Sequence, residues 1–416
     1  MSNEPVETTE GEAREILLPR GKVLRLVQLD FLRGVAILLV IGHHLRNPPA
    51  QVMSDQAGRL HPLALFLEKS GWVGVDLFFV LSGFLIGGLL FAEIRKTGGL
   101  DARRFILRRG LKIWPLYYLL LFIATAALPF WKDVRMADDP NAPLPPIWVL
   151  LWPNYLHVQN YVRTDLPAFG YLGQTWTLAI EEHFYLALPL LLLWLLRPRR
   201  NGSHSLHRLP LYALFVCIAC LLARLWTAQY PWRFITHDSP THLRMDSLFF
   251  GVLLAYGWHF HPTTLQPVLR RPFLLLLAGI LLLIPMAYRY IDDPFTCTWG
   301  YTLLYLGFGS VLMAVMSTTL HAEQRHPLAR FFTGKTASII AWIGFYSYPI
   351  YLFHMWAKLP LEGFLQYHPF GHPSVAKWIL IYALFLLFSV LLGVVAGKLI
   401  ERPVLALRDR MFPTNR

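Results

Sequence analysis

The sequence predicts an all-α integral membrane protein with about ten transmembrane helices and both termini in the cytoplasm. The first observation is composition: 55% of the 416 residues are hydrophobic and 15% are charged, whereas a soluble domain carries about 25% charged residues. The second is that ten apolar stretches approach the roughly 20 residues with which a helix crosses a bilayer. The third is that Lys and Arg gather on one side of these stretches. A soluble globular protein and a disordered chain are therefore excluded.

The predicted spans follow one another along a single membrane domain over 29–400. A polar tail over 1–28 precedes them and lacks the basic start of a secretory signal. A second cytoplasmic tail is expected over 401–416. The run at 147–156 is short and contains a proline, so we expect it to be re-entrant or interfacial. The ten spans are expected at 29–45, 72–92, 113–131, 175–196, 209–228, 243–260, 272–288, 301–319, 337–356 and 376–400.

The basic residues are distributed unequally between the two sides of the membrane. With the N-terminus inside, the inner segments hold 25 Lys and Arg, the outer segments hold 10, and three arginines lie within spans. Cytoplasmic loops carry such an excess, so the pattern predicts an even number of spans in the inner or plasma membrane. The net charge of +13 is explained by this topology, and we expect no nucleic-acid partner. Three cysteines exclude a disulfide scaffold.

The first span carries charged and ionisable residues that are costly in a bilayer and are therefore functional candidates. Asp30 and Arg33 lie near its inner end, and His43 and His44 near its outer end. Arg33 and His44 are 11 residues apart, which places them on one face of a helix at an axial separation of about 16 Å. His43 points about 100° away, as expected for an interfacial or packing histidine. A polar stripe is thus expected through most of the membrane.

The second span and the inner loop after it supply further candidates. Asp76 lies near the outer end of the span and Ser82 near its middle, among glycines that permit close helix contact or the approach of a ligand. The loop holds five basic residues that suit either an anionic ligand, such as a nucleotide phosphate, or lipid headgroups and topology. They are Arg103, Arg104, Arg108, Arg109 and Lys112.

The outer halves of three later spans add carboxylates and histidines at one depth. Glu181 and Glu182 are adjacent in the fourth span, so at most one of them is expected to face a given site. Arg244 and Asp246 lie near the outer end of the sixth span, and His354 near that of the ninth. A histidine beside a carboxylate is a general base. The basic residues near the inner face and the histidines and carboxylates near the outer face form two layers. These layers would suit a donor that has its phosphates inside and a long arm reaching outward.

These motifs together resemble the membrane-bound acyltransferase family 3, which acylates cell-surface glycans and other acceptors. The resemblance covers nearly the whole chain after residue 28. Six motifs carry it in order, and the terminal LIERP resembles the family's closing element. They are LDFLRGVAILLVIGHHL, GVDLFFVLSGFLI, RRGLKIWPLYY, QTWTLAIEEHFYLALPLL, THLRMDSLFFGVLLA and IGFYSYPIYLFH.

The resemblance implies that Arg33 and His44 are the essential pair and that acyl-coenzyme A, with acetyl the default acyl group, is the donor substrate. The family's Arg-x-x-Arg element reads Arg109 to Lys112 here, so charge is kept but a bidentate phosphate contact is lost. Gln174 stands where relatives often have histidine, and we do not expect it to be catalytic. Relatives can carry an extracytoplasmic hydrolase-like domain, so we expect this membrane domain to act alone or to pass the acyl group on.

The hypothesis is O-acyl transfer to a hydroxyl of a cell-envelope or exported glycan, with His44 as general base oriented by Glu182. No metal and no tightly bound cofactor are expected. The donor is expected to bind Arg33, Arg108, Arg109, Lys112 and Ser82. The supporting and acceptor-side residues are Asp30, Asp76, Glu181, Tyr185, Arg244, Asp246 and His354.

Several alternatives remain open at this point. A transporter or flippase would use the same histidines and glutamates as a proton relay, but no internal repeat supports it. A structural or sensory protein would bind anionic lipid with the inner basic face and would leave the buried carboxylates unexplained. The acceptor is a small molecule or a lipid in a further alternative, and a covalent acyl-histidine intermediate is compatible with the same residues.

Overall fold

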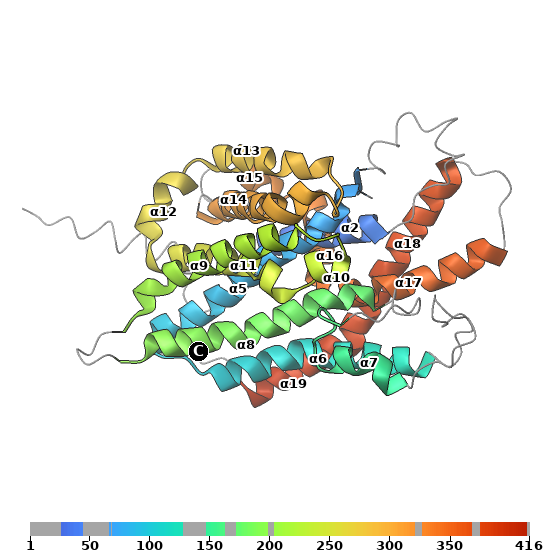
Figure 1. Ribbon diagram of the computed structural model, residues 1–416, viewed down its shortest axis with the longest axis horizontal. Coiled ribbons are helices and arrows are strands. Elements are labelled where there is room, and N and C mark those ends of the chain that lie inside the picture. The colour runs from blue at the N-terminus through green and yellow to red at the C-terminus, as the bar shows by residue number, and fades with distance from the viewer. Residues whose placement is uncertain are drawn as a thin grey trace, which may run out of the picture.

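The computed structural model confirms the all-α membrane fold. It describes residues 26–44, 66–67, 69–127, 147–162, 172–198, 204–320, 327–367 and 375–413, and within these ranges the regular elements are all helices. The long helices run side by side, and α17 and α18 extend beyond the rest of the bundle (Figure 1). Most of the expected N-terminal tail lies outside the described residues, whereas the expected C-terminal tail is described up to residue 413.

Each of the ten expected spans has a helical counterpart in the same order. The run at 147–156, expected to be re-entrant or interfacial, is the short helix α7 (Ile147–Tyr155), and α19 (Arg402–Met411) follows the last span. The ten counterparts are α2 (Val27–His44), α5 (Gly74–Thr97), α6 (Ala102–Ala127), α8 (Trp176–Leu196), α9 (Leu209–Thr227), α11 (Thr241–Phe260), α13 (Pro272–Leu283), α14 (Tyr301–Leu320), the pair α16 (Lys335–Phe345) and α17 (Ser347–Tyr367), and α18 (Val375–Ala396).

Not all of these helices meet the length and hydropathy expected of an isolated span. Within the described residues, six do so individually, and two bent helix pairs qualify if each pair is one span. The helices α6 and α11 are more polar and are not among them. The structure therefore supports between six and eight spans on these criteria, and the total of ten and the sidedness of the termini stay predictions.

The two bent pairs have a common cause in proline. The helix α12 (Pro262–Leu269) and the segment Pro272–Ala287 meet at 81°, and α16 and α17 meet at 76°. Pro272 and Pro349 each lie within the first three residues of the second helix of their pair. Proline fits the first turn of a helix but cannot continue one, because it lacks an N–H group and its ring collides with the preceding turn. The second break lies at Tyr346 and sets the direction of α17.

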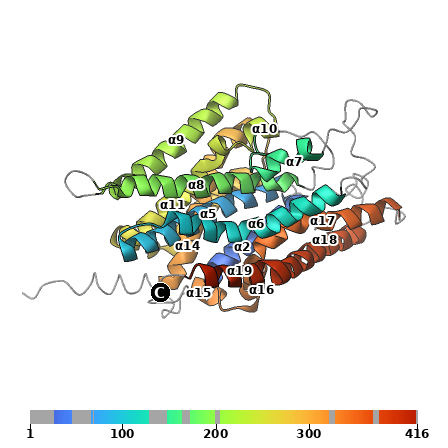
Figure 2. The same ribbon diagram turned by 90° about the horizontal axis from the view of Figure 1, so that it is seen from below.

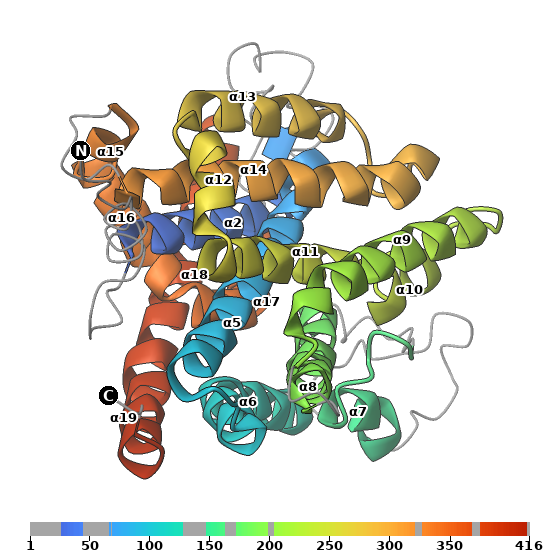
Figure 3. The same cartoon turned by 90° about the vertical axis from the view of Figure 1, so that its left-hand side faces the viewer.

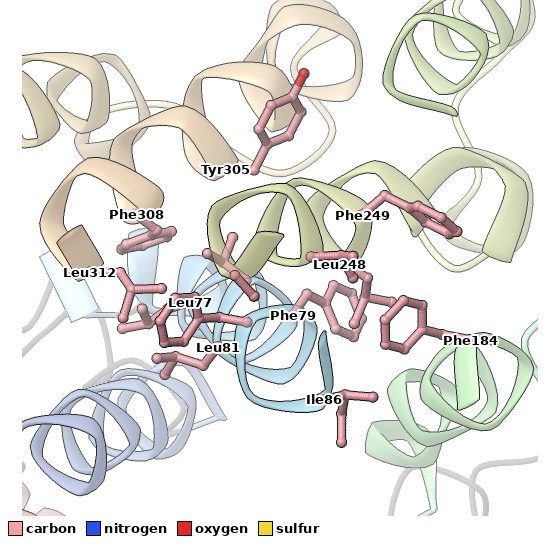
Figure 4. Packing of buried hydrophobic residues seen from close by; sticks show 14 of the residues in the cluster. Leu77, Phe79, Leu81, Ile86, Phe184, Leu248, Phe249, Tyr305, Phe308 and Leu312 are labelled. Atoms are coloured by element: carbon pink, nitrogen blue, oxygen red, sulfur yellow. The ribbon is translucent and has the colours of Figure 1, made fainter. Parts of the chain in front are cut away.

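The bundle is built around α5. Figure 3 shows α2, α5 and α11 in the middle, with α9, α13 and α19 towards the edge. Figure 4 shows side chains of α5, such as Leu77 and Phe79, packed against Leu248 of α11 and Phe184 of α8. Exposed apolar side chains gather instead on α9, α13 and α18, and α9 and α18 lie towards opposite edges in Figure 2. These helices therefore present the faces suited to lipid.

Glycines allow the central helices to approach closely. The pair α5 and α11 makes the most extensive contact in the bundle. A Cβ atom on Gly83 would overlap the carbonyl oxygen of Leu248, and one on Gly251 would overlap that of Val80. The sequence left open whether these glycines permit helix packing or the approach of a ligand, and at Gly83 the role is packing. Such small-residue contacts are typical of helix pairs in membranes.

Gly83→Ala should therefore destabilise the bundle by forcing α5 and α11 apart, at a cost of about 1–3 kcal/mol. The measurement is the thermal transition of the detergent-solubilised protein, followed by fluorescence-detected size exclusion after heating. Gly88→Ala on the same helix is the matched control, because its Cβ would meet only the His259 ring, at 3.4 Å. Equal transition temperatures for the two variants would contradict this account of the contact.

Candidate active site

Three of the four basic residues expected at the donor site line one cavity, here called the inner cavity because it lies at the end of α2 that is predicted to be cytoplasmic. It has an empty volume of about 790 Å³. Three cations line it: Arg33 from α2 and Arg109 and Lys112 from α6. Further lining side chains come from five other elements, and they include Ser82, Glu181, Tyr185, Tyr348 and Glu401. The first and third spans thus bring their cations to one hollow between helices.

Several residues that line the inner cavity are held in place by hydrogen bonds and ring contacts. The Ser82 hydroxyl donates to Oε1 of Glu181 at 2.5 Å and lies 3.4 Å from the Tyr185 hydroxyl. The Arg109 guanidinium lies over the Tyr185 ring, 4.8 Å from its centre. Arg33 has an ion pair with Asp30 at 3.6 Å, one turn earlier on α2. Nε of Arg109 is buried and has no hydrogen-bond partner within the described part of the chain, so it is available to an anion.

The outer cavity contains the two adjacent histidines. Its empty volume is about 770 Å³, and His43 and His44 line it from the end of α2. His43 thus shares this cavity, although the helical spacing predicted a separate face for it. The other lining residues include Trp72, Gln174, Trp176, Asp238 and Arg244. Val75 and Tyr351 line both cavities, so the two hollows are neighbours along the stripe from Arg33 to His44.

The contacts of His44 define which of its ring nitrogens carries a proton. Nδ1 lies 2.9 Å from the carbonyl oxygen of Val40 and 3.4 Å from Nε2 of His354. A carbonyl only accepts, so Nδ1 of His44 is the donor. His354 likewise donates from Nδ1 to the carbonyl of Tyr351 at 2.6 Å, which leaves its Nε2 as an acceptor. The neutral His44 ring therefore keeps a lone pair on Nε2.

This geometry differs from the expected pairing of His44 with Glu182. Among the described residues, the two hydrogen-bond partners of His44 are Val40 and His354. Glu182 accepts a hydrogen bond from Trp114 at 3.3 Å and lines neither cavity. Its neighbour Glu181 is the carboxylate that shares a cavity with Arg33. Adjacent helical residues point about 100° apart, so only one of the pair enters the site.

Arg108 also departs from its expected place. Its guanidinium donates to the carbonyl oxygen of Phe412 and to Oδ1 of Asp409 at 3.0 Å. It therefore ties α6 to the region around α19 and does not line the inner cavity. Arg109, Lys112, Arg33 and Ser82 remain as the lining residues of the expected donor set.

Buried ion pairs brace the outer half of the bundle. Arg244 of α11 donates from Nη2 to both carboxylate oxygens of Asp76 on α5, at 3.0 Å each, and from Nη1 to Asp238 at 3.2 Å. Tyr301 donates to the same oxygen of Asp238. Asp246 pairs with Arg224 of α9 at 2.6 Å. These side chains are no more than 1% exposed.

Sequence reasoning missed Arg224 and Asp238 as members of this cluster. Arg224 was visible as one of three arginines within spans, and such a residue requires a partner in the bundle. Asp238 lies in a short connection before α11. An acidic residue in a connection is common, so the sequence did not indicate that Asp238 is buried in an ion pair. Asp246 was expected beside Arg244, but the structure gives it the partner on α9.

The fold and the site together define a multi-pass α-helical membrane protein with a half-buried histidine in one cavity and three cations lining a neighbouring cavity. Over residues 26–398 the chain matches the family described as "Acyltransferase domain". It belongs to that acyltransferase family, which confirms the resemblance of its motifs. The number of apolar helices and the family together place it in a membrane, most simply the plasma membrane.

Two curated relatives illustrate the similarity. The chain is 29% identical over 348 residues to the peptidoglycan O-acetyltransferase OatA of Listeria monocytogenes, which covers 78% of this chain and 48% of that protein. It is 27% identical over 392 residues to the O-acetyltransferase OatA of Staphylococcus aureus, covering 90% and 56% respectively. The chain thus spans about half the length of the curated relatives it matches. No solved structure matches it.

Asp76→Ala should destabilise the protein strongly, by about 3 kcal/mol or more, because it removes the bidentate partner of a buried guanidinium. The thermal transition in detergent measures the effect. Arg289→Ala is the matched control, since Arg289 pairs with Asp293 at 2.9 Å but its side chain is 43% exposed, and an exposed pair contributes at most about 1 kcal/mol. A loss for Asp76→Ala no larger than that of the control would refute the bracing role.

Proposed function

We propose that this chain is a membrane O-acetyltransferase that moves an acetyl group from acetyl-coenzyme A to a hydroxyl of a cell-envelope glycan of the peptidoglycan type. One observation carries the proposal: a histidine with a free Nε2 lone pair lies in a cavity that adjoins a cationic cavity on the same helix face. Membership of the acyltransferase family supports the reaction class. The names of the relatives support acetyl as the group and peptidoglycan as the acceptor.

The inner cavity is proposed to bind the donor through its phosphates. Arg33, Arg109 and Lys112 converge there from two helices, and phosphate oxygens are good acceptors for guanidinium and ammonium groups. Lys112 supplies a point charge where the family resemblance predicts a second arginine, so Arg109 and Arg33 would supply the planar, bidentate contacts. The Arg109 guanidinium is already fixed by the Tyr185 ring, which reduces the entropy lost on binding.

The acetyl thioester is proposed to reach His44 past Val75 and Tyr351, the residues that line both cavities. Nε2 of His44 takes the proton of the acceptor hydroxyl as its oxygen attacks the thioester carbonyl. The carbon–sulfur bond then breaks, and the thiolate recovers that proton from the histidine. The Val40 carbonyl and His354 hold the ring in the required tautomer, which is the role expected earlier of Glu182.

His44→Ala should abolish acetyl transfer, by about a hundredfold or more, because general-base catalysis contributes about 10²–10⁴-fold. The assay uses the purified, full chain with labelled acetyl-coenzyme A and a soluble peptidoglycan-type oligosaccharide, and mass spectrometry of the product. His259→Ala is the control, since His259 lines neither cavity. Normal product from His44→Ala would refute the proposed base. A wild-type chain that forms no ester, but moves substrate across a vesicle, would identify the transporter alternative instead.

Arg109→Ala should raise the KM for acetyl-coenzyme A about tenfold or more, because a hydrogen bond to a charged group contributes about 1.5–3 kcal/mol. Its neighbour Arg108 is the matched control: it carries the same charge on the same helix but binds Asp409 and Phe412. Arg108→Ala should leave that KM within about twofold. Equal effects of the two substitutions would mean that general positive charge, not the cavity, attracts the donor.

A further inference from the structure

The outer cavity is lined by four residues whose buried polar atoms have no partner. They are the donors Nε1 of Trp72 and Nε of Arg244 and the acceptors Oδ2 of Asp238 and Oε1 of Gln174, each without a hydrogen bond within the described part of the chain. The four residues are no more than 5% exposed. They come from different elements, so their convergence reflects the fold and not one local motif.

Such atoms are unusual in a folded protein. More than 90% of buried polar groups have a hydrogen-bond partner, and leaving one without costs about 1–3 kcal/mol. The other polar atoms of the same residues are well satisfied: Gln174 donates from Nε2 to Leu352 at 3.0 Å, and Asp238 pairs through Oδ1 with Arg244. These contacts fix the orientation of the side chains, so the unpartnered atoms cannot turn towards other groups of the protein. A ligand in the cavity would supply the missing partners.

The chemistry of the four atoms indicates a neutral, hydroxyl-bearing ligand. Two donors and two acceptors together match hydroxyl groups, because each hydroxyl both donates and accepts. Arg244 already pairs with two carboxylates, Asp76 and Asp238, so no positive charge is left in the cavity to attract an anion. The rings of Trp72, Trp176 and Phe234 contribute apolar lining, which suits the carbon–hydrogen faces of a sugar ring.

We propose that the outer cavity is the acceptor site and binds one sugar ring of the glycan, with the reacting hydroxyl at Nε2 of His44. Hydroxyl groups of the ring donate to Oδ2 of Asp238 and Oε1 of Gln174, and oxygen atoms of the ring substituents accept from Nε1 of Trp72. This inference rests on the proposed function, because it assigns the acceptor side of that reaction. It adds the residues that recognise the acceptor and the chemical class that they recognise.

Trp72→Phe tests the inference most directly, because it removes one donor that binds nothing else and keeps an aromatic ring. Gln174→Met is the second variant and removes an acceptor. The probe is a soluble oligosaccharide of alternating N-acetylglucosamine and N-acetylmuramic acid, of which N-acetylglucosamine is the uncharged ring proposed for the cavity, with acetyl-coenzyme A as donor. Each variant should raise the KM for the oligosaccharide about three- to tenfold, the worth of one hydrogen bond, and leave the KM for acetyl-coenzyme A within about twofold. Trp258→Phe is the control, since Trp258 is 7% exposed and lines neither cavity.

A binding measurement on the unaltered chain guards against misfolded variants. The wild-type protein should bind the oligosaccharide without donor, as detected by saturation-transfer NMR, and absence of binding at millimolar concentration would overturn the inference. A raised KM for acetyl-coenzyme A with an unchanged acceptor KM would also overturn it, because the cavity would then hold the acyl arm. If neither KM changes, the four atoms bind only water, and the inference fails while the proposed function stands. Binding that depends on Trp72 without any acetylated product would uphold the acceptor site and refute the proposed function.

Discussion

The buried ion pair between Arg244 and Asp76 is the interaction on which the outer half of the structure depends. It joins α11 to α5 where glycines bring these helices into contact. Neither charge has access to solvent, so separating the helices would expose both to an environment in which an unpaired charge is costly. The pair also determines the position of Asp238, because Arg244 holds one oxygen of that carboxylate. The other oxygen is consequently left without a partner beside the outer cavity.

The bend between α16 and α17 has a comparable effect on the inner half. Because α16 packs closely on α2, with Gly344 against the Asp30 carbonyl, a straight continuation would carry the following residues past the cavities. The break at Tyr346 turns α17 by 76° and brings Tyr348 and Tyr351 to the cavity walls. One turn further, His354 reaches the ring of His44, with 4.9 Å between ring centres. The bend thus supplies the second of the two contacts of His44 Nδ1, beside the Val40 carbonyl.

The features that periodicity and depth control were predictable from the sequence. The ten helical segments follow from apolar length, and the common face of Arg33 and His44 follows from the helical repeat, since both depend on one segment alone. The partners of charged residues were not predictable in this way. Whether Glu181 or Glu182, and whether Arg108 or Arg109, enters the site depends on the rotation of each helix against neighbours that are distant in sequence. Arg224 and Asp238 show the same limit, because an ion pair requires knowledge of both members.

The separation of Arg33 from His44 gives the proposed reaction a simple electrostatic logic. The two residues are about 16 Å apart along α2, so the phosphates of a donor held at the inner cavity would remain among Arg33, Arg109 and Lys112 while its thioester end lies near His44. Val75 and Tyr351 line both cavities, and neither side chain carries a charge, which suits an uncharged arm. An acetyl group would therefore travel outward without any ionic group leaving its counter-charges, and the large cost of moving a charge through a bilayer would be avoided. In the proposed reaction the two cavities would therefore divide the work: the inner cavity would bind the ionic part of the donor, and the outer cavity would receive its uncharged acetyl group.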